Sequence, residues 1–274
     1  MELKLRLKEL QEKELSCLSN RELEELIENM LENIGAIDPE LRDHLIYPTF
    51  IRFIDEGMLS EDNRLYLFNT CLDDHHLFYK IGEINTDSVF TRSFSSLVLT
   101  GLLSYDRQVG QFSKDYIDLS FKKAIDYLSL ELDTRGYVEE KGWAHSIAHG
   151  ADLLVSIVKH PLFNKGQFHE VLEVLENCLF KDATYIDDED ERLIFVLEAL
   201  HETNIDEKML EDWIIQIFNG LESIYENEGF SNNYFRKKFN ITNFLKTLYF
   251  RIGFKRVQEM IKESLNTLHQ KVYS

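Results

Sequence analysis

Residues 19–34 read SNRELEELIENMLENI, and their spacing predicts an amphipathic α-helix. Ser19 and Glu22 have the spacing of a capping box, in which each side chain accepts a hydrogen bond from the backbone N–H of the other residue. Apolar side chains then recur at helical steps, so they share one face: Leu23, Leu26, Ile27, Met30, Leu31 and Ile34. This pattern is typical of a helix that buries one side against its neighbours.

The same helical period fills most of the chain. It recurs at Phe168, Val171, Leu172, Leu175, Cys178 and Leu179, and again at Met209, Leu210, Trp213, Ile214, Ile217, Phe218 and Leu221. Only 12 glycines and 3 prolines interrupt it, and strand signals are nearly absent. We therefore expect an all-α protein, with further helices near residues 3–16, 39–56, 60–79, 87–104, 113–132, 187–202, 236–250 and 254–271.

The helix spacing also suggests an architecture. Helix pairs recur at roughly 40 to 47 residues, which is the size of HEAT or armadillo units. We expect an array of antiparallel helical hairpins, and the period alone leaves open whether it forms an open superhelix or a closed α/α toroid. Residues 1–274 are expected to form a single all-helical domain, with residues 1–85 as a less distinct N-terminal helical subdomain in the alternative.

Composition limits the classes of partner. A hydrophobic fraction of 44% predicts a folded chain, and a net charge of −19 disfavours nucleic acids and anionic membranes. Cys17, Cys71 and Cys178 are widely spaced, which argues against a disulfide framework and a cysteine zinc site. The first residues, MELKLRLK, do not have the pattern of a signal peptide, so we expect a cytoplasmic protein.

Residues 142–158, GWAHSIAHGADLLVSIV, have an unusual composition for a helix. His145, His149 and Asp152 recur on one helical stripe, and small alanines flank them. The segment contains no Lys, Arg or Glu, although an exposed helical face normally carries long charged side chains. Gly150 in mid-helix suggests close approach by another backbone or a ligand. The segment therefore predicts an enclosed polar space.

Three interpretations of this stripe remain open. It is a buried hydrogen-bonded network without chemistry, or a pocket for an organic ligand, or a site where His145, His149 and Asp152 hold a divalent metal such as zinc. The predicted ligand pocket consists of Trp143, His145, His149 and Asp152, with help from Arg92 or Arg135.

Arg92 is the one charged residue in a long apolar stretch, between Phe90 and Phe94. A buried guanidinium needs a carboxylate or a ligand anion beside it. The expected carboxylates are Asp133 and Asp152.

Several segments resemble one bacterial family of unassigned activity. They are GWAH and AHGAD within residues 142–152, DSVFTRSF at 87–94, DEDERL at 188–193 and NFLKTLYFRI at 243–252. From about Asp87 onward the chain resembles domain of unknown function 2785. The resemblance implies a bacterial protein from a low-GC Gram-positive organism, and it implies no catalytic residues.

The leading functional hypothesis is a cytosolic helical scaffold that binds a small molecule or a protein through the Trp143, His145, His149 and Asp152 pocket. The alternative is a metal-dependent hydrolase that uses the His145, His149 and Asp152 stripe. The sequence leaves open whether the protein is an enzyme.

Overall fold

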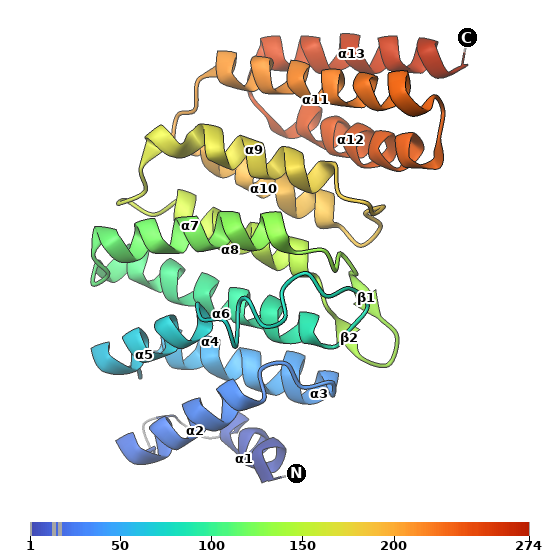
Figure 1. Cartoon of the computed structure of the whole chain (residues 1–274). Coiled ribbons are helices and arrows are strands. Elements are labelled where there is room, and N and C mark those ends of the chain that lie inside the picture. Colours follow the sequence, from blue (N-terminus) through green and yellow to red (C-terminus); the bar gives the residue numbers. More distant parts are fainter. Residues whose placement is uncertain (1, 13–14, 16–17, 274) are drawn as a thin grey trace. The chain divides into compact units, whose positions relative to one another are not determined.

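The computed structural model describes residues 2–12, 15 and 18–273, and most of these residues lie in helices (Figure 1). The prediction of an all-α fold is confirmed. In the described residues the one sheet is a two-stranded antiparallel hairpin, with Tyr137 opposite Trp143 and Val138 opposite Gly142. None of the described helices is long and apolar enough to cross a membrane.

Contacts divide the chain into two compact units, Met1–Phe163 and Asn164–Ser274. Compactness does not say whether a unit folds alone, so the expectation of a single domain stays a prediction. The first unit contains α1 (Glu2–Gln11), α2 (Asn20–Glu32), α3 (Pro39–Leu41), η2 (Arg42–Ile46), α4 (Tyr47–Asp55), α5 (Glu61–Cys71), α6 (Ser88–Val109), α7 (Lys114–Leu130), β1 (Tyr137–Val138), β2 (Gly142–Trp143) and α8 (Ser146–Val158). The second contains η3 (Lys165–Gln167), α9 (Phe168–Leu179), α10 (Glu189–Glu202), α11 (Glu207–Glu228), α12 (Asn232–Arg251) and α13 (Lys255–Tyr273).

In the first unit, α6 is the central helix. It packs against α4, α5 and α8, and α7 packs against α8 (Figure 1). The side chains that these contacts bury completely include Phe90, Val98, Leu99, Leu103, Ile147, Leu154 and Ile157. Burial of such apolar surface is the main force that holds the helices together.

In the second unit, α12 is in contact with α9, α10, α11 and α13, and α11 also packs against α13. The buried side chains here include Leu175, Leu197, Ile217, Phe244 and Leu248. The contacts join helices that are one, two or three places apart in sequence. Whether the whole array is a superhelix or a toroid stays a prediction.

The observed helix boundaries agree with those predicted from the sequence in some places and differ in others. The capping box of α2 is present, because Ser19 N–H donates to Glu22 Oε2 at 2.9 Å and Glu22 N–H donates to Ser19 Oγ at 3.3 Å. The helix expected over 60–79 ends at Cys71, where Asp73 accepts from the backbone N–H of His75 and starts a turn. Of the helix expected over 3–16, residues 13, 14 and 16 lie outside the described residues, as does Cys17.

The helix expected over 39–56 contains a π-helical segment, η2, between α3 and α4. Pro48 explains part of this break, because proline has no N–H to donate to the carbonyl four residues earlier. That carbonyl, of His44, accepts instead from Nε2 of Gln11 at 3.0 Å. Segments of π-helix are frequent at functional sites.

Candidate functional site

The structure brings three of the six predicted site residues together at the start of α8. Trp143 ends β2, His145 directly precedes α8, and His149 lies one turn into the helix. The ring centroids of Trp143 and His145 are 4.2 Å apart with a tilt of 33°. Those of His145 and His149 are 5.7 Å apart and perpendicular. Asp152 is half-buried on the next turn of α8.

These rings belong to a longer chain of aromatic contacts. At the exposed end of this series of aromatic contacts, the rings of Tyr137 and Trp143 meet edge-on, with centroids 5.0 Å apart. At the buried end, His149 meets Phe94 at 5.5 Å, and Phe94 meets Tyr47 at 6.2 Å. The contacts therefore run from an exposed hairpin into the core between α4, α6 and α8.

The position of His145 follows from the local backbone. Ala144 N–H donates to the Gly136 carbonyl at 2.8 Å, and His145 N–H donates to the Arg135 carbonyl at 3.0 Å. His145 itself has a left-handed backbone with φ of 47°. The helix therefore begins at Ser146 instead of Gly142, and His149 N–H closes its first turn on the His145 carbonyl at 2.8 Å.

Burial accounts for the lack of long charged side chains along α8. Ala144, Ala148 and Ala151 are completely buried, and His149 is 7% exposed. A Cβ on Gly150 would lie 2.6 Å from Cδ2 of Leu128, so the close approach that this glycine permits is by a side chain of α7. Helices α6 and α7 thus cover much of α8, and the enclosed polar space expected beside it stays a prediction.

Arg42 is a residue of this region that the sequence analysis missed. It is completely buried on η2, and its guanidinium carbon lies 4.0 Å from the ring centroid of Phe90 and 4.9 Å from that of Phe94. Nη1 donates to the Ala36 carbonyl and Nη2 donates to the Lys141 carbonyl, each at 2.5 Å. Arg42 therefore connects η2 to α6 and to the hairpin through cation–π contacts and hydrogen bonds.

Asp43 connects the guanidinium group of Arg42 to Trp143 and so to the series of aromatic contacts. Its Oδ1 lies 2.8 Å from Nε of Arg42, and its carboxylate accepts from the backbone N–H of Trp143. Burial raises the pKa of the Asp43 carboxyl, although the Arg42 charge acts in the opposite direction. A Cβ on Gly142 would lie 2.7 Å from Oδ2 of Asp43, and Gly142 has φ of 80°, so only glycine fits there without strain.

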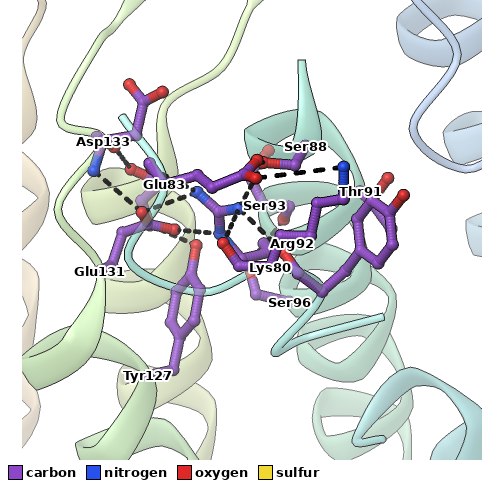
Figure 2. Close-up of polar contacts among 12 residues, drawn as sticks. Lys80, Glu83, Ser88, Thr91, Arg92, Ser93, Ser96, Tyr127, Glu131 and Asp133 are labelled. Carbon is purple, nitrogen blue, oxygen red and sulfur yellow. Dashed lines mark hydrogen bonds and ion pairs between the residues drawn. The ribbon is translucent and has the colours of Figure 1, made fainter. Parts of the chain in front are cut away.

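Arg92 is also completely buried, and it forms a bidentate ion pair with Glu131. Nε lies 2.6 Å from Oε2 and Nη2 lies 2.8 Å from Oε1. Nη1 donates to Ser88 Oγ at 2.8 Å (Figure 2). It also donates to the Tyr79 carbonyl at 2.9 Å. Desolvation lowers the pKa of Arg92, but the hydrogen bonds and charge of Glu131 outweigh it, so that the pKa is raised.

The carboxylate that binds Arg92 is thus not one of the two expected from the sequence. Asp133, one of the expected pair, binds Arg135 instead, with Oδ2 at 2.6 Å from Nη2 and Oδ1 at 2.8 Å from Nε. Nη2 of Arg135 also donates to the Thr86 carbonyl at 2.7 Å. Glu131 was missed because it directly follows α7, where a charged residue usually faces solvent. Both guanidinium groups are engaged by carboxylates of the chain.

Within the described ranges, no group of three or more His, Cys, Asp or Glu residues is arranged to hold a metal ion. The predicted set of His145, His149 and Asp152 is therefore not such a group. The prediction placed all three on one helical stripe, whereas His145 precedes the helix with a left-handed backbone and its ring packs against Trp143. Whether His145, His149 and Asp152 hold a metal stays a prediction.

These features lie mostly within a segment of the chain that matches a known protein family. A family model described as a protein of unknown function (DUF2785) matches residues 77–250, which is more than half of the chain. The matched range contains the hairpin, α8 and all six predicted site residues, whereas η2 with Arg42 lies outside it. No curated protein and no solved structure matches the chain significantly.

Proposed function

We propose that this chain, which belongs to the family of proteins of unknown function DUF2785, is a binding scaffold that recognises its ligand through Tyr137, Trp143 and His145. These three side chains are called the aromatic platform. The observation that carries the proposal is exposure: Trp143 is 42% exposed and Tyr137 is 54% exposed. Exposed, rigid tryptophan and tyrosine side chains are typical anchors of binding sites.

The platform is preorganised, which favours binding. The Trp143 backbone is fixed by pairing with Tyr137 in the hairpin and by its hydrogen bond to Asp43. Its ring rests on His145, which in turn contacts the buried His149. Binding to rings that are already held in place costs little conformational entropy.

Charge indicates the class of ligand. Glu139 and Glu140 are exposed in the hairpin turn between Tyr137 and Trp143. Lys141, the basic residue of the same turn, is paired with Asp87 at 2.7 Å. An indole face next to carboxylates suits a cation, through cation–π attraction and long-range steering. The proposed ligand is therefore a positively charged group, such as a lysine or arginine side chain of a protein segment.

The scaffold is proposed to act in a bacterial cytoplasm, as an array of helical hairpins that presents the platform. Arg92 and Arg135 are assigned to support of the fold, because each is held by a carboxylate of the chain.

The test uses the fluorescence of Trp143. In a Trp213→Phe background Trp143 is the sole tryptophan, and two peptides of equal length are titrated, one with alternating Lys and Ser and one with alternating Glu and Ser. We expect saturable binding of the cationic peptide alone, measured by the Trp143 emission and independently by calorimetry.

Matched variants locate the interaction. Trp143→Ala should weaken binding by roughly tenfold or more in calorimetry, because it removes the anchor of the platform. Tyr66→Ala removes a tyrosine that is 48% exposed on α5 and should leave binding unchanged. Equal affinity of Trp143→Ala and the parent protein, or absence of binding by both peptides, would refute the proposal.

A further inference from the structure

A second candidate site lies within residues 164–274, separate from the aromatic platform. It is a cavity of about 550 Å³ lined by side chains of α9 and α11 and of the turn before α11. This volume is in the range of roughly 300 to 1,000 Å³ that is usual for small-molecule pockets. Its lining combines apolar side chains, such as Leu172 and Met209, with several ionisable groups.

Trp213 lines this cavity and carries a buried hydrogen-bond donor that no described residue satisfies. The residue is 4% exposed, its ring meets Phe244 edge-on at 6.0 Å, and it lines the cavity. Among the described residues, Nε1 of Trp213 has no hydrogen-bond partner. Buried indole N–H groups usually find a partner, so one that lines a cavity without a protein partner points to an acceptor supplied by a ligand.

Glu176 lines the same cavity and carries a buried acceptor atom. Gln216 donates a hydrogen bond to the Glu176 side chain, yet Oε2 is buried and has no hydrogen-bond partner within the described part of the chain. Burial raises the pKa of the Glu176 carboxyl, and the charge of Glu173 raises it further. A cationic donor beside Oε2 would satisfy this atom and favour its ionised form.

The charges around the cavity favour a cation as well. Glu173, Glu176, Asp206 and Asp212 contribute four carboxyl groups to the lining. The basic residues of the lining are His169 and Lys208, and Lys208 is held by Asp212 at 2.7 Å. An anionic ligand would meet repulsion from these carboxylates, whereas an ammonium group would be attracted.

We propose that this cavity binds an organic amine with an apolar body and a neighbouring hydroxyl or carbonyl oxygen. The ammonium group donates to Oε2 of Glu176, the oxygen accepts from Nε1–H of Trp213, and the apolar body lies against Leu172 and Met209. The two unsatisfied atoms thus receive the two kinds of partner that they need.

Three related probes test this arrangement on the intact protein by calorimetry. The first is 2-amino-1-phenylethanol, which carries both polar groups; 2-phenylethylamine lacks the oxygen, and 1-phenylethanol lacks the amine. We expect saturable binding of the amino alcohol, with an affinity about fivefold or more above that of 2-phenylethylamine. The difference in affinity between the amino alcohol and the neutral 1-phenylethanol should be larger still. No saturable binding of the amino alcohol at millimolar concentration, or an equal affinity for the neutral alcohol, overturns the proposal.

Variants assign the two contacts. Glu176→Gln keeps the shape of the side chain but removes its charge, and it should lower the affinity for the amino alcohol by roughly tenfold or more. Trp213→Phe should abolish the preference for the amino alcohol over 2-phenylethylamine. Glu226→Gln, which removes an exposed carboxylate elsewhere on α11, is the matched control and should bind like the parent. Parent-like binding by Glu176→Gln overturns the proposal, and the probe series on the parent protein decides it even if a variant fails to fold.

This inference does not depend on the aromatic platform. Trp143→Ala should leave the affinity for 2-amino-1-phenylethanol unchanged, and Glu176→Gln should leave the affinity for the cationic peptide unchanged. A loss of both bindings in Trp143→Ala would contradict the assignment of the amino alcohol to this cavity.

Discussion

The two completely buried arginines of the first unit show opposite electrostatic balances. For Arg92, the ion pair with Glu131 outweighs desolvation, and the pKa of the guanidinium is raised. For Arg42, desolvation outweighs the attraction of Asp43, and the pKa is lowered. Glu131 is as completely buried as its arginine, whereas the side chain of Asp43 is 15% exposed.

The difference lies in what each arginine contacts. Arg92 has a bidentate carboxylate of its own, so its site is a closed ion pair that joins α6 to the end of α7. Arg42 relies on carbonyl oxygens and on the rings of Phe90 and Phe94, and its carboxylate partner is shared with the backbone of Trp143. We infer that Arg92 chiefly stabilises the fold, whereas Arg42 also positions the hairpin that carries the aromatic platform.

The largest expected effect is at the closed ion pair. Glu131→Gln should lower the free energy of unfolding by about 3 to 5 kcal/mol, because it leaves a buried guanidinium without its counter-ion. The measurement is urea-induced unfolding followed by circular dichroism. The double variant Arg92→Met with Glu131→Leu should recover much of this loss, since it removes both charges and keeps most of the volume. A cost below 1 kcal/mol for Glu131→Gln, on the order of a surface pair, would remove the basis of the comparison.

Arg42→Met should cost less, about 2 to 3 kcal/mol in the same measurement, because methionine retains the packing on Phe90 and Phe94 and the carboxyl left behind can take up a proton. It should also change the emission of Trp143 in a Trp213→Phe background, since the hairpin loses the bond from Arg42 to the Lys141 carbonyl. Arg92→Met should leave that emission unchanged. If both variants changed it equally, the two arginines would not differ in the way proposed.

The sequence predicted the class of fold because helical period, capping and the sparsity of proline act locally. Ser19 and Glu22 form the capping box that their spacing indicates. The family was likewise predicted from short segments of the sequence, and the match over residues 77–250 confirms the family. These features depend on residues within a few turns of one another.

The sequence could not predict which distant residues would meet. Glu131 reaches Arg92 across 39 positions, and Arg42 reaches Lys141 across 99. Pro48 was a visible signal for an irregular helix near Arg42, but nothing local indicates that the irregular turn faces the hairpin. The prediction that His145, His149 and Asp152 form one stripe assumed an unbroken helix. His145 instead has a left-handed backbone, which depends on hydrogen bonds to Arg135 and Gly136.

The junction between Asp43 and the hairpin can be tested with a glycine pair. Gly142→Ala should destabilise the protein by about 2 kcal/mol, because a Cβ would meet Asp43 and Pro39 as well as an unfavourable backbone angle. Gly110→Ala, at φ of 67° with no described atom within 4 Å of the added Cβ, has the backbone strain alone and should cost about 1 kcal/mol. Equal costs in thermal unfolding would show that the hairpin does not press against Asp43.

The smallest expected effect is the pH dependence of stability that the Asp43 carboxyl causes. It tests whether the Arg42 site differs electrostatically from the Arg92 site. Burial raises the pKa of this carboxyl above its ordinary value of 3.8, so the folded state holds a proton that the unfolded chain has already lost. The resulting stabilisation is fully present below that ordinary value and is lost as the pH rises through the folded pKa. Asp43→Asn cannot titrate, so the free energy of unfolding of the parent minus that of Asp43→Asn should fall as the pH rises from strongly acidic to neutral.

Glu139→Gln, which removes an exposed carboxylate from the same hairpin, is the matched control for this pH series. Unfolding by urea at a set of pH values from strongly acidic to neutral gives the difference for each variant. A difference for Asp43→Asn that rises with pH would mean that the Arg42 charge outweighs desolvation at Asp43. The site of Arg42 would then be a closed ion pair like that of Arg92, and the assignment of Arg42 to the support of Trp143 would lose its electrostatic basis.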